Sequence, residues 1–276
     1  MCELFGISSN HPVALTMSLE EFARHGSPER STRDGWGIAY YHGRDVRLIK
    51  DTAPAASSEW LGFVAGHCLR SPTVLSHIRH ATQGDVCYSN TQPFERELGG
   101  RRHVLAHNGN LADIRAAVDL SGGGFRPIGD TDSEWAFCAL LQRMAPLWRD
   151  PARLPDLDRR LEVFSGFAAG MRQLGPANFL YADGDALFLH ADRRRQADGR
   201  IVPPGLWRVE RECAPDSPGH PEIAGAALET ERQRVVLAAS VPLTGEAWHP
   251  MARGEVVALR QGRIVARSDG ESSAQG

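Results

Sequence analysis

Lysine is nearly absent from this chain. Lys50 is the one lysine, so arginine supplies almost all of the positive charge of 31 Lys and Arg residues. We therefore do not expect Schiff-base chemistry, which needs a lysine amine as the nucleophile. Acidic residues outnumber basic ones, for a formal net charge of -3. This balance excludes the general positive field that attracts nucleic acid.

Paired cysteines and long apolar runs are missing too. The five cysteines are odd in number and never spaced as Cys-x-x-Cys, which argues against a disulfide scaffold or a zinc ribbon and fits a reducing cytoplasm. No signal peptide or membrane-spanning run is visible. The pairs His77/His80 and His103/His107 lack a cysteine or acidic residue spaced to complete a tetrahedral metal site. We expect a cytoplasmic protein with no metal or cofactor, and no membrane or nucleic-acid partner.

The hydrophobic pattern predicts one large domain over 1–267, followed by a polar, disordered tail at 268–276. Short apolar runs bounded by turn residues predict strands at 3–8, 36–41, 46–50, 73–79, 103–107, 177–181, 186–190, 234–239, 255–259 and 263–266. Helical periodicity predicts helices at 13–25, 57–68, 110–119, 132–148 and 157–174. The stretch 192–233 is interpreted as loops with one or two edge strands. Its run Arg193-Arg194-Arg195 is expected to be a solvated loop, with a site for an anionic partner as the alternative.

Cys2 directly follows the initiator methionine. Cysteine is small enough that methionine removal is expected, which leaves a thiol nucleophile beside a free α-amino group. That amine, with a reference pKa of roughly 7.7–8.0, can act as the thiol's own base, so no distant histidine is needed. The alternative is that Cys2 is an accident of a disordered start. The apolar run at 4–7, however, predicts a buried strand that would carry the terminus into the core.

Three further motifs carry groups suited to amide hydrolysis. His77-Ile78-Arg79-His80-Ala81-Thr82 ends one predicted strand, His107-Asn108-Gly109 ends another, and Gly129-Asp130-Thr131-Asp132-Ser133-Glu134 opens a helix. Asn108 and Gly109 can donate a side-chain amide and a backbone N–H to an oxyanion, although an Asn-Gly pair is often only a turn. Arg79 can clamp a carboxylate, or form a surface salt bridge. Asp132 can pair with an ammonium group, or only cap the helix.

The order and spacing of these motifs resemble the class II glutamine amidotransferases, which belong to the N-terminal-nucleophile hydrolases. Two stretches, Asp34-Gly35-Trp36-Gly37 and Asn90-Thr91-Gln92-Pro93-Phe94, resemble the small stand-alone members. The resemblance implies an α+β fold, a four-layer αββα sandwich with two mainly antiparallel sheets between helical layers. It also implies the roles given above for Cys2, Asn108, Gly109, Arg79 and Asp132. His77 is placed on the substrate side, as a hydrogen-bonding residue rather than a base.

The chain departs from the family pattern in three places. Many members have histidine at the position of Gln92 and tryptophan at that of His80, which bears on the glutamine pocket rather than on the chemistry. Members that make amino sugars, purines or asparagine carry a synthase domain after the glutaminase domain, and 276 residues leave no room for one. A partner synthase is therefore expected to accept the ammonia.

Three functions are compatible with the sequence. The first is hydrolysis of the side-chain amide of glutamine through a γ-glutamyl thioester on Cys2. The second is a stand-alone γ-glutamyl amidohydrolase that acts on a larger metabolite, with residues 192–233 shaping the pocket for the leaving group. The third is a non-catalytic binding module that keeps the fold.

Overall fold

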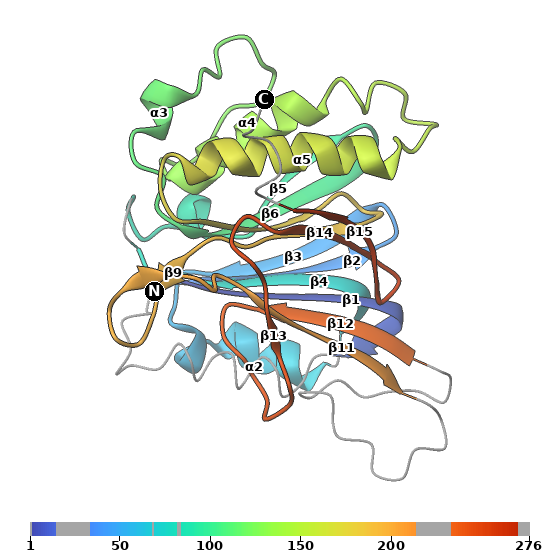
Figure 1. The fold of residues 1–276 in the computed structure, drawn as a ribbon. Helices are drawn as coiled ribbons and strands as arrows, with labels where there is room; N and C mark the ends of the chain where they lie inside the picture. Colours follow the sequence, from blue (N-terminus) through green and yellow to red (C-terminus); the bar gives the residue numbers. More distant parts are fainter. Residues whose placement is uncertain (1, 15–33, 68, 82–83, 214–232, 270–276) are drawn as a thin grey trace.

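Two antiparallel sheets lie face to face in the computed structural model, which describes residues 2–14, 34–67, 69–81, 84–213 and 233–269 (Figure 1). The seven-stranded sheet has the order β13-β11-β12-β1-β4-β2-β3. Its strands are β1 (Glu3–Ala14), β2 (Trp36–His42), β3 (Asp45–Asp51), β4 (Arg70–Ile78), β11 (Trp207–Cys213), β12 (Gln233–Ala239) and β13 (His249–Pro250). The nucleophile candidate Cys2 therefore stands at the head of a central strand.

The second sheet has six strands in the order β15-β14-β8-β7-β6-β5. They are β5 (Phe94–Leu98), β6 (Arg101–Gly109), β7 (Ala177–Ala182), β8 (Leu187–His190), β14 (Val256–Arg260) and β15 (Arg263–Ser268). A separate two-stranded ribbon joins β9 (Arg194–Arg195) to β10 (Ile201–Val202). All of these strand pairs are antiparallel, and hairpins join β2 to β3, β5 to β6, β7 to β8 and β14 to β15.

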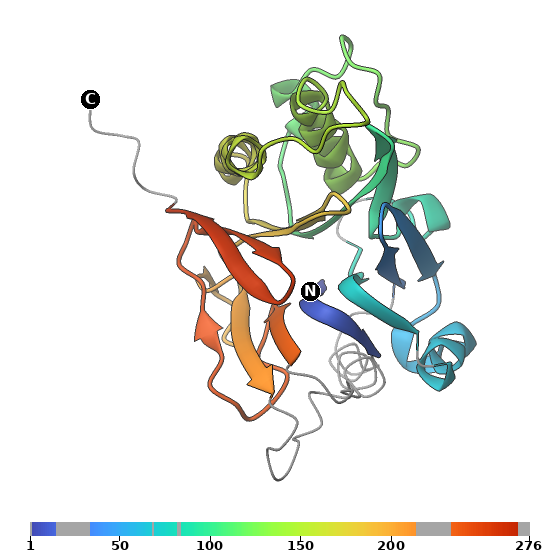
Figure 2. The same ribbon diagram turned by 90° about the vertical axis from the view of Figure 1, so that its right-hand side faces the viewer.

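Helices cover the outer faces of both sheets (Figures 1 and 2). The described helices are α2 (Glu59–Gly66), α3 (Ile114–Ala117), α4 (Asp132–Met144) and α5 (Leu157–Arg172), with short 3-10 turns at Ala55–Ser57 and Tyr88–Asn90. Helices α4 and α5 lie on the six-stranded sheet, and α2 lies on the seven-stranded sheet. The predicted four-layer αββα sandwich is confirmed. None of the described helices combines the length and the apolar character needed to span a bilayer.

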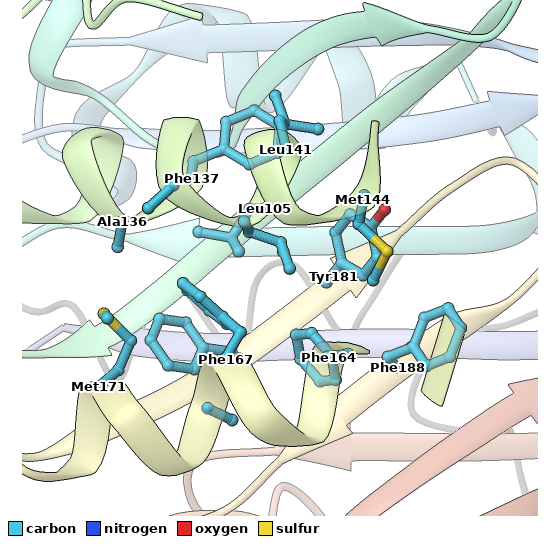
Figure 3. Packing of buried hydrophobic residues seen from close by; sticks show 14 of the residues in the cluster. Leu105, Ala136, Phe137, Leu141, Met144, Phe164, Phe167, Met171, Tyr181 and Phe188 are labelled. Carbon is cyan, nitrogen blue, oxygen red and sulfur yellow. The ribbon is translucent and has the colours of Figure 1, made fainter. Parts of the chain in front are cut away.

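Strand alternation divides the core into three apolar layers. Leu4 packs between the sheets, while its neighbour Phe5 packs toward α2, because successive strand residues point to opposite faces. In β6, Leu105 points toward α4 and α5, where it meets the aromatic side chains Phe164 and Phe167 (Figure 3). Burial on both faces holds the strand ends that carry the candidate site in fixed positions.

Several element predictions need correction. Val13 and Ala14 belong to β1, not to a helix, because they pair with Ser71 and Arg70 after an irregularity in the β1–β4 register; residues 15–25 of that helix lie outside the described residues. The helix expected over 110–119 is only Ile114–Ala117, preceded by Asp113 in the left-handed conformation at φ 54°. Strand β5 was not predicted. Ser268 ends β15 rather than opening a disordered tail.

Candidate functional site

Pairing between β1 and β4 brings Cys2 to the turn that follows β4. Glu3 pairs with Ile78, so the residue before β1 lies beside the residues after β4. The backbone N–H of His80 donates to Cys2 Sγ at 3.2 Å, and the thiol lies 3.4 Å from the His80 carbonyl oxygen. Within the described chain these main-chain groups are the hydrogen-bond partners of the sulfur, so no side chain stands there as a base.

The surroundings of Cys2 favour the neutral thiol. Desolvation raises its pKa to about 11, and the N–H of His80 opposes this only in part. A thiol with this pKa is protonated at neutral pH, whereas the thiolate is the nucleophile. The site therefore needs a proton acceptor next to the sulfur before Cys2 can react.

Asn108 links the nucleophile to the sheet interface. Its side-chain Nδ2 donates to the Cys2 carbonyl oxygen at 2.7 Å and to Ser240 Oγ at 3.1 Å. Both amide hydrogens are thus engaged in the free protein. Gly109 follows, and a Cβ there would meet the Pro176 carbonyl oxygen at 1.8 Å, so only glycine fits this position.

A buried ion pair, which the sequence did not predict, fixes the start of β1. Arg194 Nη2 donates to Glu3 Oε1 at 2.8 Å, and Arg194 Nη1 donates to the Ser240 carbonyl oxygen at 2.9 Å. The Ser240 hydroxyl oxygen accepts from Leu4 N at 2.9 Å as well as from Asn108. Arg194 is only 5% exposed, so the expectation of a solvated arginine run is wrong for this residue. The β9–β10 ribbon is thereby tied to the N-terminal strand (Figure 1).

Arg79 lies next to the His80 contact and is almost fully buried. Its Nη2 donates to the Gly84 carbonyl oxygen at 3.1 Å, and its Nη1 lies 3.5 Å from the Asp34 carbonyl oxygen. The Asp34 carboxylate accepts from the backbone N–H of Ala81 at 2.7 Å. Asp34 thus shapes the turn that carries both Arg79 and His80, a role that the sequence did not predict.

Asp132 begins α4 and reaches the segment after Gly109. Its Oδ2 accepts from Leu111 N at 2.7 Å, and its Oδ1 accepts from Ser133 N at 2.8 Å. The helix cap is Thr131, whose hydroxyl accepts from Glu134 N. A carboxylate has about four lone-pair sites, and Asp132 uses three of them, the third for the Ser133 hydroxyl at 3.3 Å from Oδ1, so it keeps some acceptor capacity. The contact with Leu111 places Asp132 beside the Asn108–Gly109 pair.

Two further residues of the predicted motifs, His77 and Gln92, are buried. His77 is fully buried in β4, and burial lowers its pKa to about 3, so the imidazole is neutral. Gln92 bonds the backbone of His107 in both directions, accepting at 2.6 Å and donating at 3.2 Å. Gln92 therefore extends the edge of β6 just before Asn108. Among the residues that can be described, no group of three His, Cys, Asp or Glu side chains could hold a metal ion.

The αββα architecture with a cysteine at the head of a central strand defines the class of the fold, that of the N-terminal-nucleophile hydrolases. The sequence model of the class II glutamine amidotransferases matches residues 1–275. The chain belongs to this family.

Similar proteins agree with this assignment. YafJ of Escherichia coli K12, a candidate glutamine amidotransferase, is 34% identical over 92% of this chain and 96% of its own length. A predicted glutamine amidotransferase from Pseudomonas aeruginosa PA01 superposes with a TM-score of 0.69 at 33% identity, over 96% of this chain and 100% of that chain. The glutamine phosphoribosylpyrophosphate amidotransferase of B. subtilis shares the fold, with a TM-score of 0.60 at 16% identity over 97% of this chain and 49% of that chain.

Proposed function

We propose that this protein hydrolyses the side-chain amide of glutamine, with Cys2 as an N-terminal nucleophile. The observation that carries the proposal is the position of Cys2. It stands at the head of β1, with its sulfur against the His80 main chain and its carbonyl held by Asn108. No side chain contacts the sulfur as a base in the described residues, which fits a nucleophile that uses its own α-amino group.

The reaction begins once Met1 has been removed. The α-amino group takes the thiol proton, and the sulfur attacks the side-chain carbonyl carbon of glutamine. The negative charge that develops on the carbonyl oxygen is stabilised by Asn108 Nδ2 and the backbone N–H of Gly109. One Asn108 hydrogen must then be shared with the oxyanion, because both are engaged in the free protein. The C–N bond then breaks, the protonated α-amino group of Cys2 gives its proton to the leaving nitrogen, and ammonia leaves.

Water completes the cycle. The α-amino group takes a proton from water, which attacks the γ-glutamyl thioester, and the C–S bond breaks to release glutamate and the Cys2 thiol. Arg79 holds the α-carboxylate of the substrate, and Asp132 holds its ammonium group. A separate synthase that accepts the ammonia would make the protein the glutaminase component of an amidotransferase.

The test is glutamate release from glutamine by the purified full-length chain. Intact mass first establishes that Met1 is gone. Cys2→Ala should abolish release, while Cys87→Ala, at another half-buried free cysteine, should leave it unchanged. Absence of glutamate from correctly processed protein would exclude free glutamine as the substrate. Equal release by the Cys2→Ala variant would exclude the mechanism.

A further inference from the structure

Three arginines converge on one buried carboxylate outside the site described above. Asp192 lies between β8 and β9 and is fully buried. Its Oδ1 lies 3.0 Å from Arg253 Nε and 3.7 Å from Arg172 Nε, and its Oδ2 lies 3.9 Å from Arg193 Nε. The backbone N–H of Ala177 also donates to Oδ2, at 3.3 Å. The carboxylate is thus a fixed centre around which three guanidinium groups are held.

The cluster carries an excess of positive charge. Three guanidinium groups share one carboxylate, and each faces it through Nε. Their terminal NH2 groups have no protein acceptor within the described part of the chain. The Arg172 side chain is only 12% exposed, so water cannot fully solvate its charge. Burial lowers the pKa of the neighbouring His190, and the positive charge of Arg172 adds to this lowering.

Guanidinium groups with unused paired N–H donors are suited to an oxyanion ligand. Carboxylates and phosphates accept two parallel N–H bonds from one arginine, and such charge-assisted bonds are stronger than neutral ones. Arg193 and Arg253 have side chains exposed by 34% and 42%, so a ligand can reach them from solvent.

The cluster is one side chain away from the proposed oxyanion donors. Asn178 in β7 pairs with Asn108 in β6. Its Nδ2 donates to the Asn108 carbonyl oxygen at 2.9 Å and to the Arg193 carbonyl oxygen at 3.0 Å, and its Oδ1 accepts from Asp192 N at 2.8 Å. Asn178 thus joins the segment that carries Asp192 and Arg193 to the strand end that carries the proposed oxyanion donors.

We infer that Arg172, Arg193 and Arg253 form a binding site for an anionic group, a carboxylate or a phosphate. The inference rests on the proposed function where it names a substrate class: γ-glutamyl amides whose amine half carries an anionic group. Arg79 and Asp132 hold the glutamyl half, and the three arginines hold the anion of the leaving amine. Ammonia, the leaving group of free glutamine, carries no anionic group that this site could bind.

Two matched substrates test the assignment. γ-Glutamylglycine carries a carboxylate on its amine half, and γ-glutamylethylamide has a similar size without one. We expect kcat/KM to favour γ-glutamylglycine by roughly tenfold or more, the ratio that charge-assisted hydrogen bonds supply. Arg253→Met and Arg193→Met should each bring the ratio toward one. Arg159→Met, the same change at an exposed arginine of α5, should leave the ratio unchanged.

Titration calorimetry of inorganic phosphate into the full-length Cys2→Ala variant tests the site without turnover. Phosphate binding that Arg253→Met weakens, together with the substrate ratio, supports the inference. A substrate ratio near one in the unmodified protein would overturn the assignment of the leaving group. Phosphate binding that is absent, or insensitive to Arg253 and Arg193, would overturn the anion site. Failure to cleave glutamine and both amides would count against the proposed function, while the phosphate measurement would still decide the anion site.

Discussion

Cys2 poses the chemical problem of this site at the scale of a single residue. Its thiol has a pKa raised to about 11, so at neutral pH it needs a base that the described side chains do not supply. An arginine inserted between Met1 and Cys2 should prevent methionine removal and bury the proposed base in a peptide bond. We expect glutamate release to fall by roughly 100-fold or more, the usual contribution of a general base. Steady-state rates with intact mass measure this.

The prediction would be wrong if the extended variant, with the inserted arginine confirmed by intact mass, released glutamate about as fast as the unmodified protein. Another group would then be the base. A chemical control separates the base from the nucleophile: alkylation of Cys2 by iodoacetamide in the extended variant should require a pH near 11, because the thiol keeps its raised pKa.

Single residues of the site differ in how well the sequence predicts them. Cys2, Arg79, Asn108 and Asp132 stand in short motifs at strand or helix ends, and the structure links them through His80 and Leu111. The partners that hold them carry no local signal. Arg194 meets Glu3 across 191 positions, and Ser240 meets Asn108 across 132. Only tertiary folding pairs such residues, and so an arginine run that looked solvated proved to contain a buried cation. The catalytic roles themselves stay predictions.

At the scale of an element, Lys50 anchors the chain segment from Gly84 to Gln92. Lys50 Nζ in β3 donates to the carbonyl oxygens of Thr91 at 2.8 Å and Tyr88 at 3.3 Å, and it lies 4.5 Å from the centre of the Tyr88 ring. Gly84 of the same segment accepts from Arg79. Lys50→Met should therefore loosen Arg79, the arginine that we propose holds the substrate carboxylate. We expect KM for glutamine to rise roughly tenfold, as loss of a charged hydrogen bond implies.

The pH dependence of KM gives the matched control. Burial lowers the pKa of Lys50 to about 8, so the ammonium group loses its proton as the pH rises above 8. KM for glutamine should rise between pH 8 and 9.5 in the unmodified protein. Lys50→Arg keeps its charge throughout, because arginine is not deprotonated in this range, so its KM should rise less, only as far as loss of the substrate's own ammonium proton causes. Identical KM profiles for the two proteins would contradict the anchoring role.

Elements were predicted best where the pattern is local. Strand β7 and helix α5 have a clear hydrophobic pattern, and their observed bounds are close to the predicted ones. Strand β5 has the sequence Phe-Glu-Arg-Glu-Leu, and it lies at the edge of the sheet, where it pairs with β6. Edge strands often carry charged residues, so the sequence lacks the apolar run by which the other strands were predicted. The predicted start of the helix at 13–25 is wrong, because Val13 pairs with Ser71 in the sheet. This tertiary pairing overrides the helical periodicity of the local sequence.

At the scale of the whole molecule, the sandwich keeps several titratable groups away from water. His77, His103 and His190 are all buried, and desolvation lowers their pKa values to about 3, 4 and 3. The folded chain therefore holds these imidazoles neutral well below pH 6.5. The unfolded chain binds a proton at each of them below that pH, so its population is favoured as the pH falls.

This difference predicts marked acid sensitivity. Between pH 6.5 and 4.5, each of the three histidines should lower the free energy of unfolding by about 1.4 kcal/mol per pH unit. The raised pKa of buried Glu3 acts in the opposite direction, because its neutral form favours the folded state at low pH. Urea unfolding from pH 7 to 4.5 measures the net slope. His190→Phe should reduce the slope by about 1.4 kcal/mol per pH unit, while His42→Gln at the exposed end of β2 should leave it unchanged. A slope unchanged by His190→Phe would mean that His190 does not couple folding to acid, and the buried histidines would then not explain the acid limit of this fold.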